Sequence, residues 1–260
     1  CIRDSIIFMP LINLNKKYDK FVTFGCSYST GHKIGETGSW GYHLSKLLNC
    51  EHYNYGFNGS SNNLIMDNVV KFCESNDTNN VCLGVQWSEW SRREFWVESE
   101  MKYKSFNVPS LERLESMKND SPELYFFRDN QDFFVSLWFD YKENILRTIQ
   151  SMILTKNYLD NKNIDYIMFE GLGSILDMFY PNKEHISGHN DLVLLSDEFK
   201  LKILNDKCFF NKLGDMRTLM KIHPLYEDIN DGHPNPKFLE WWCLEMYNDI
   251  KVKYEKTNSN

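Results

Sequence analysis

The stretch that decides the fold is Lys20–Gly31, KFVTFGCSYSTG. Phe21 to Phe24 form a short apolar and β-branched run, typical of a buried strand, and Gly25 breaks it into small and polar residues. A strand that ends in Gly-x-Ser presents a hydroxyl at the carboxyl end of a parallel sheet, where open α/β sheets bind their ligands. Ser27 is a nucleophile there if a histidine and oxyanion donors lie close to it. The alternative is that Gly25 makes a turn and Ser27 caps the next helix.

The residues that follow alternate between helix and strand patterns. Residues 40–48 have apolar side chains at helical spacing, and residues 50–55 predict a second strand. Ser60 or Ser61 is a candidate cap for the next helix, and residues 80–86 predict a third strand. This β-α-β-α-β order is typical of a parallel, doubly wound sheet.

The second half of the chain continues the pattern with interruptions. A long helix is predicted over residues 131–160, a fourth strand over 164–169, and a last helix that begins near Pro236. Residues 95–131 and 174–222 are too long for plain connections, so we expect lid-like insertions into one domain that spans all 260 residues.

Composition excludes several classes of protein. A net charge of −7 without a basic cluster argues against nucleic-acid binding. No apolar run approaches the roughly 18 residues of a membrane span. The seven cysteines are scattered without a C-x-x-C pair, which predicts reduced, buried thiols in a soluble protein of a reducing compartment such as the cytoplasm.

The predicted strand ends bring candidate catalytic residues to one edge. Ser27 follows the first strand, Gly59 the second and Gln86 the third, while Asp231 and His233 precede the last helix. Acyl transfer needs a hydroxyl nucleophile, an imidazole base, a carboxylate that orients the base, and oxyanion donors. The sequence therefore contains the groups for a serine hydrolase site.

Five short motifs resemble the blocks of the SGNH (GDSL-like) hydrolases, above all a phage and bacterial branch whose first block is G-C-S. The matching residues are Gly25-Cys26-Ser27 with Gly31, Ser39-Trp40, Asn54-x-Gly56-x-x-Gly59-Ser60-Ser61-Asn62, Leu83-Gly84-x-Gln86, and Asp231-Gly232-His233-Pro234-Asn235. They cover residues 21–90 and 228–250 but not the middle of the chain.

The resemblance implies a flavodoxin-like three-layer α/β/α sandwich and ester hydrolysis without a metal or other cofactor. It makes Ser27 the nucleophile, His233 the general base and Asp231 the orienting carboxylate. The oxyanion hole would consist of the backbone N–H groups of Ser27 and Gly59 and the side chain of Gln86.

The sequence departs from the family pattern at two positions. Gln86 stands where the family has Asn, which keeps an amide donor but adds a methylene. The spacing before His233 is Asp-x-His instead of Asp-x-x-His, with Asn230 at the usual carboxylate position. A backbone carbonyl could therefore orient His233 in place of Asp231.

The expected substrate is an acylated small molecule or glycan, commonly acetylated. Trp87, Arg92 and Asn62 are the predicted substrate-binding residues, although aromatic side chains after the third strand also suit lid packing. Cys26 is predicted to be a buried thiol that points away from the Ser27 face. His185, His189, His223 and Asp191 fit no common metal-ligand spacing.

The leading hypothesis is a serine esterase or deacylase that forms an acyl-enzyme on Ser27. An O-acyltransferase uses the same chemistry. The alternative is an inactive SGNH-like protein that binds glycans or forms part of a virion, with a phage particle or a second copy of the chain as its partner. A nucleotide binder is disfavoured because residues 25–31 lack both G-x-G-x-x-G and the P-loop pattern.

Overall fold

The computed structural model describes residues 12–97, 102–107, 141–172, 215–225 and 232–258. Its centre is a parallel sheet of four strands in the order β2-β1-β3-β6, as in flavodoxin-like folds. The strands are β1 (Lys20–Phe24), β2 (Glu51–Asn54), β3 (Val81–Trp87) and β6 (Asp165–Glu170). The predicted parallel α/β fold is confirmed, and the strand limits differ from the predicted ones by one or two residues.

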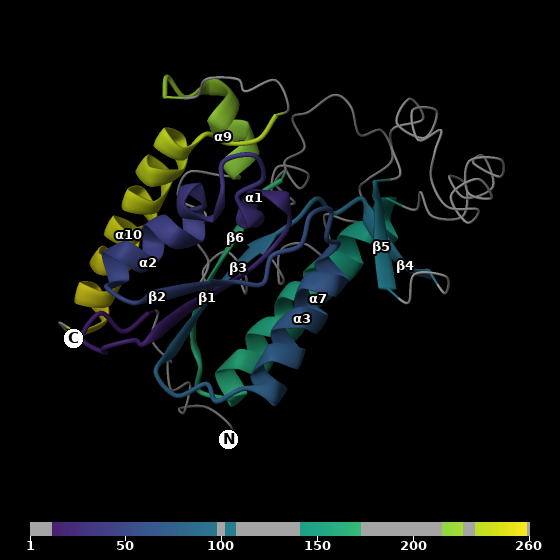
Figure 1. Cartoon of the computed structure of the whole chain (residues 1–260). Helices are drawn as coiled ribbons and strands as arrows, with labels where there is room; N and C mark the ends of the chain where they lie inside the picture. The colour runs from purple at the N-terminus through teal and green to yellow at the C-terminus, as the bar shows by residue number, and fades with distance from the viewer. Residues whose placement is uncertain (1–11, 98–101, 108–140, 173–214, 226–231, 259–260) are drawn as a thin grey trace.

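Helices cover both faces of the sheet (Figure 1). One face carries α2 (Trp40–Leu48) and α10 (Pro236–Asn258), and the other carries α3 (Asn62–Ser75) and α7 (Tyr141–Asn161). All seven residues of β3 are buried because this central strand is covered from both sides. The result is the expected three-layer sandwich.

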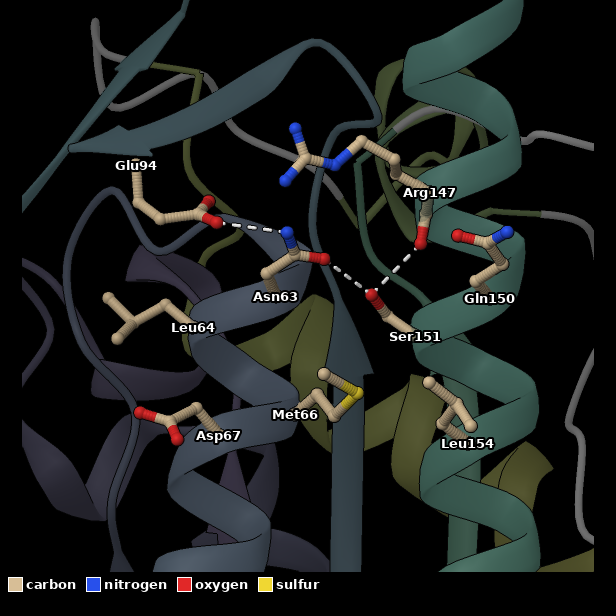
Figure 2. A pocket seen from close by; sticks show the side chains of 9 residues that line it. All are labelled: Asn63, Leu64, Met66, Asp67, Glu94, Arg147, Gln150, Ser151 and Leu154. Atoms are coloured by element: carbon tan, nitrogen blue, oxygen red, sulfur yellow. Dashed lines mark hydrogen bonds between the residues drawn. The ribbon is translucent and has the colours of Figure 1, made fainter.

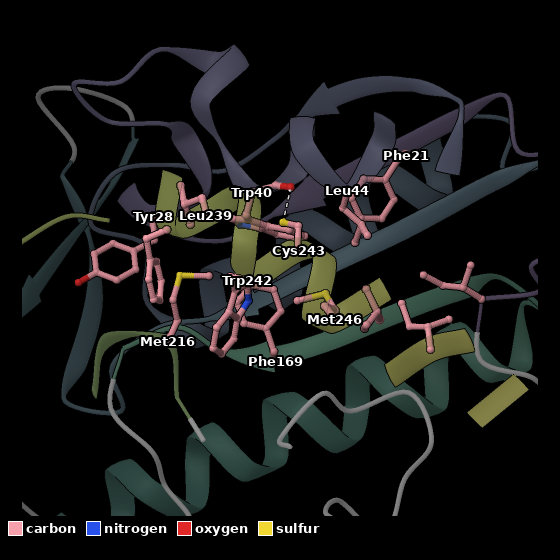
Figure 3. Close-up of a cluster of buried hydrophobic side chains, with 14 of the residues drawn as sticks. Phe21, Tyr28, Trp40, Leu44, Phe169, Met216, Leu239, Trp242, Cys243 and Met246 are labelled. Carbon is pink, nitrogen blue, oxygen red and sulfur yellow. Dashed lines mark hydrogen bonds between the residues drawn. The ribbon is translucent and has the colours of Figure 1, made fainter. Parts of the chain in front are cut away.

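Each face of the sheet has its own apolar core. Under α2 and α10, large aromatic side chains from three elements pack together, among them Trp40, Phe169 and Trp242 (Figure 3). Trp242 is fully buried, whereas its neighbour Trp241 is only half-buried and stacks on His223. These cores fix the two helical layers against the strands that end at the candidate site.

Residues with small side chains occupy the N-cap positions of the helices near the site. Ser61 caps α3, because its side chain accepts a hydrogen bond from the Leu64 N–H. The short helix α1 (Ser27–Thr30) begins differently: Cys26 is its cap residue and Ser27 is already helical. The alternative prediction that Ser27 is a helix cap is therefore wrong.

A two-stranded hairpin and a short helix appear where an irregular chain was predicted. The strands β4 (Arg92–Val97) and β5 (Lys102–Asn107) pair antiparallel in a separate two-stranded sheet. Asp215 caps helix α9 (Met216–Ile222), because its side chain accepts a hydrogen bond from the Thr218 N–H. Both segments are short, so neither carries a long apolar periodicity that the sequence could show. The other parts of the predicted insertions, and the start of the predicted helix 131–160, lie outside the described residues.

Within the described segments, no helix has the length and apolar character needed to cross a membrane.

A close packing contact joins β1, β2 and α2. The His52 ring on β2 lies 2.9 Å from the Thr23 hydroxyl on β1. Gly41 of α2 sits directly above, where a Cβ atom would approach His52 Nε2 to 2.3 Å. Burial lowers the pKa of His52 to about 4, since the charged ring would lose its hydration. Glu36 lies 3.7 Å away but is largely exposed, so water screens its attraction.

This burial predicts an acid-sensitive fold. The folded pKa of His52 lies below the unfolded value of about 6.5, so its contribution to stability is complete above pH 6.5 and is lost as the pH falls towards about 4. We expect His52→Gln to flatten the fall of the free energy of unfolding over this range, measured by urea unfolding at a series of pH values. If the free energy of unfolding fell equally steeply with pH in the wild type and in His52→Gln, His52 would not be the cause of the acid sensitivity.

Candidate functional site

Ser27 lies at the turn between β1 and α1. Its neighbours Cys26, Tyr28 and Ser29 are buried, but Ser27 itself is half-exposed. Gly31 ends the short helix with a positive φ of 70°, and its N–H donates to the Ser27 carbonyl. The Ser27 hydroxyl makes no hydrogen bond to any described residue. The fold thus holds the Ser27 backbone firmly and leaves its hydroxyl available.

The strand order places this turn at the switch point of the sheet. The chain leaves β1 for β2 on one side and later returns to β3 on the other, and in such sheets ligands bind where the order reverses. The loop after β2 stays beside the Ser27 turn, because Phe57 N–H donates to the Gly25 carbonyl over 2.9 Å. The Thr30 hydroxyl donates to Asn58 Oδ1 over 2.7 Å.

Gly59, in the same loop, has the properties expected of an oxyanion donor. Its φ of +81° is a conformation that glycine adopts without strain. A Cβ atom here would meet nothing within 4 Å, so the space next to it is open. Among the described residues, no acceptor for the Gly59 N–H is found.

Gln86 was predicted to be the side-chain donor of the oxyanion hole. Its side chain is fully buried beneath the Ser27 turn: Oε1 accepts from the Ser29 hydroxyl over 2.7 Å, and Nε2 donates to the Trp87 carbonyl over 3.2 Å. The extra methylene relative to Asn lets the amide reach into the core. This amide is engaged in structural hydrogen bonds, which does not fit the predicted oxyanion donor.

The buried amide belongs to a chain of polar contacts. The Trp40 indole N–H donates to Ser29 Oγ over 2.8 Å, and Ser29 in turn donates to Gln86. Two glycines make room for it: a Cβ at Gly25 would lie 2.2 Å from Ser29 Oγ, and one at Gly171 would lie 1.9 Å from Gln86 Nε2. The chain connects α2, α1 and β3 directly below Ser27.

His233 comes from the loop before α10 and packs on α1. The Tyr28 hydroxyl donates to the Gly232 carbonyl over 2.6 Å. The His233 ring lies 5.2 Å from the Tyr28 ring and 4.8 Å from the His32 ring, centroid to centroid, and both of its nitrogens are shielded from solvent. The fold thus brings His233 to the residue next to Ser27. Asp231 lies outside the described residues.

Two predicted substrate-binding residues are interior. Trp87 is fully buried and Asn62 is 4% exposed. The Asn62 amide donates to the Ser88 carbonyl and the Thr148 hydroxyl, and its oxygen accepts from the Ser88 N–H. These placements join α3, α7 and the end of β3, and they do not fit contact with a substrate.

The third predicted residue has a more open position. Arg92 is half-buried, and its guanidinium donates to the Ser60 carbonyl over 3.5 Å, one residue from Gly59. Within the described ranges Arg92 has no carboxylate partner. It therefore stays a candidate for substrate contact.

Phe57 is a candidate that the sequence analysis missed. Its side chain is 56% exposed, although its backbone is bonded to Gly25 beside Ser27. An exposed aromatic ring at this place offers a flat apolar surface to a ligand. The sequence feature that could have identified Phe57 is an aromatic residue between Gly56 and Gly59, in a loop that follows a predicted strand.

Four of the five described cysteines are buried free thiols, as predicted, and Cys50 is half-buried. Cys26 is buried and points to Gln86, away from solvent. Burial raises the pKa of Cys73 to about 11, so this side chain is a neutral thiol at pH 7. Among the described residues, no group of three or more His, Cys, Asp or Glu side chains is arranged to hold a metal ion. His185, His189 and Asp191 lie outside the described residues.

A separate hollow of about 400 Å³ lies between α3 and α7 (Figure 2). Its polar side chains bind one another: Asn63 donates to Glu94, and the Ser151 hydroxyl donates to Asn63. We assign no chemistry to this hollow.

No protein-family model and no curated protein matches the sequence. Similar solved structures include a psychrotrophic esterase from Pseudoalteromonas sp. (12% identity, 93% of this chain and 100% of the other, TM-score 0.48). A member of the lipolytic protein G-D-S-L family from Veillonella parvula has 10% identity over 88% and 98% of the chains, with a TM-score of 0.45. An acetyl xylan esterase from Butyrivibrio proteoclasticus has 13% identity over 93% and 65%, with a TM-score of 0.47. These likenesses are distant, and the functional proposal rests on the site.

The buried amide gives a direct test. We expect Gln86→Leu to lower the free energy of unfolding by about 2–3 kcal/mol, because the Ser29 hydroxyl and the Trp87 carbonyl lose their partners in the core. Urea unfolding measures this change, with the exposed Lys46→Gln as a control that should stay within about 0.5 kcal/mol. An unfolding curve like that of the wild type, together with a loss of catalytic rate, would restore the oxyanion role.

Proposed function

We propose that the protein is a carboxylic ester hydrolase with Ser27 as its nucleophile. The observation that carries the proposal is the packing of His233 on Tyr28, the residue next to a half-exposed serine at the switch point of the sheet. Such a pair of hydroxyl and imidazole is the basis of acyl transfer through a covalent intermediate.

In the proposed reaction the Ser27 Oγ attacks the ester carbonyl while His233 accepts the hydroxyl proton. The tetrahedral intermediate collapses, His233 returns the proton to the leaving alcohol, and the acyl group stays on Ser27. A water molecule, deprotonated by His233, then attacks the acyl-enzyme, and the proton returns to Ser27 as the acid leaves. Asp231 is the proposed orienting carboxylate.

The oxyanion would be stabilised by two backbone donors. Ser27 N–H stands at the start of α1, and the Gly59 N–H of the neighbouring loop has no acceptor among the described residues. Since the Gln86 amide is engaged below, the proposed hole consists of these two groups alone. One such donor contributes roughly 10²–10³ in kcat in known enzymes.

The proposed substrate is an acyl ester, most simply an acetyl ester, on a carbohydrate. Phe57 supports this choice, because its exposed ring beside the Ser27 turn suits the apolar face of a sugar. Arg92 offers hydrogen-bond donors to hydroxyl or carboxylate groups on the same side. Transfer of the acyl group to another sugar hydroxyl requires the same acyl-enzyme.

The engaged Gln86 amide also favours a second candidate, a glycan-binding protein of the same fold without activity. In that protein Phe57 would bind the sugar and Ser27 would have no chemical role. The two candidates differ in whether turnover depends on Ser27.

We expect Ser27→Ala to lower the turnover of p-nitrophenyl acetate by about 10³ or more, since the nucleophile is removed. A fluorophosphonate probe should label the wild type at Ser27, located by mass spectrometry. Ser75→Ala, at the exposed end of α3, is the matched control and should keep both turnover and labelling. Equal rates for wild type and Ser27→Ala, without labelling, would favour the glycan-binding candidate.

Phe57 gives a test of substrate class. We expect Phe57→Ala to raise KM for acetate release from glucose pentaacetate by about tenfold, because the sugar loses its apolar contact, with a smaller change for p-nitrophenyl acetate. Tyr53→Ala, which removes an exposed aromatic ring from β2, the strand before the Phe57 loop, serves as the control. An unchanged KM for the sugar ester would exclude Phe57 from the binding surface.

A further inference from the structure

A second histidine lies against the proposed base. The ring of His32 is 4.8 Å from the ring of His233, at an interplanar angle of 49°. His32 follows Gly31, which ends α1, and its backbone N–H donates to the Ser27 carbonyl over 3.4 Å. One short turn therefore holds both the proposed nucleophile, Ser27, and a second imidazole, that of His32. The His32 ring contacts the proposed base, His233, which lies about 200 residues further along the chain.

This contact joins two imidazoles, and imidazole is the side chain whose charge ordinarily changes between pH 5 and 8. Two imidazoles in contact do not become charged independently, because the first proton disfavours the second. Tyr28 also packs on His233 from α1, and its hydroxyl donates to the Gly232 carbonyl. Asp231, the nearest acidic residue in sequence, lies outside the described residues.

We propose that His32 is a positioning residue of this site: its ring holds His233 against α1, and its positive charge in acid keeps His233 neutral to lower pH. The inference rests on the proposed function for its catalytic meaning. A general base acts only when neutral, so the pair would extend activity into mildly acidic solution.

The pairing itself is tested without any substrate. The imidazole signals of the full-length protein are followed by ¹H–¹⁵N NMR from pH 4.5 to 9, and His233 is assigned from the signal that is missing in His233→Gln. We expect His32→Phe, which keeps an aromatic ring on His233, to raise the midpoint of the His233 titration by about 0.5–1 pH unit. His43→Phe is the matched control, since the recorded ring contact of His43 is with Tyr42 on α2, and it should leave that midpoint unchanged.

The catalytic meaning is tested by the pH profile of kcat/KM for p-nitrophenyl acetate. The acid limb of the profile should move to higher pH in His32→Phe by the same amount as the NMR midpoint. His32→Ala removes the ring contact as well and should also lower kcat at high pH by about tenfold. If His32 had a purely structural role, its substitution would change the free energy of unfolding but leave the acid limb of the kcat/KM profile at its wild-type pH.

The outcomes separate three claims: the pairing of His32 with His233, the esterase activity and the role of His233 as general base. An unchanged His233 midpoint in His32→Phe overturns the pairing, and His32→Gln provides the same comparison if the Phe variant does not fold. A shifted midpoint without Ser27-dependent turnover supports the pairing and rejects the proposed esterase. A shifted midpoint with an unshifted acid limb rejects His233 as the general base.

Discussion

The buried hydrogen-bond chain Trp40–Ser29–Gln86 is the constraint on which the candidate site depends. It connects the first helix of one layer, the turn that holds Ser27 and the central strand β3 through bonds of 2.7–2.8 Å. Low-dielectric surroundings strengthen such a chain and make every unpaired member costly, so its geometry is sharply defined. Ser29 is fixed inwards by this chain, whereas Ser27, two positions earlier in the same turn, stays half-exposed.

The sequence predicted the layers of the fold more readily than the directions of its side chains. Alternating strand and helix patterns between Lys20 and Trp87 are local signals, and the structure reproduces them. The direction of Gln86 depends on space left by Gly25 and Gly171, which are distant in sequence. The same limit applies to Trp87, whose aromatic ring suited a binding surface and a core equally well.

For the candidate site as well, the positions of the loops were predictable from the sequence, whereas the exposure and contacts of individual side chains were not. Glycine-rich strand ends indicated that the Ser27 turn and the loop with Gly59 lie side by side, since parallel strands share one carboxyl edge. Phe57 and His32 were not predicted, because exposure and ring contact arise only when the loop after β2 and the loop before α10 fold onto α1. The hairpin β4–β5 was missed for a related reason: its pairing is a contact between two strands, neither of which is distinctive alone.

The bond between Tyr28 and Gly232 joins residues 204 positions apart, and this separation has a consequence for synthesis. The Ser27 turn and its first two neighbouring strands are complete once residue 87 has left the ribosome, whereas the base arrives with the last helix. Long-range contacts of this kind form late, because their loop must close first. A nascent chain would therefore fold the turn that holds the proposed nucleophile, Ser27, before the proposed base, His233, has been synthesised.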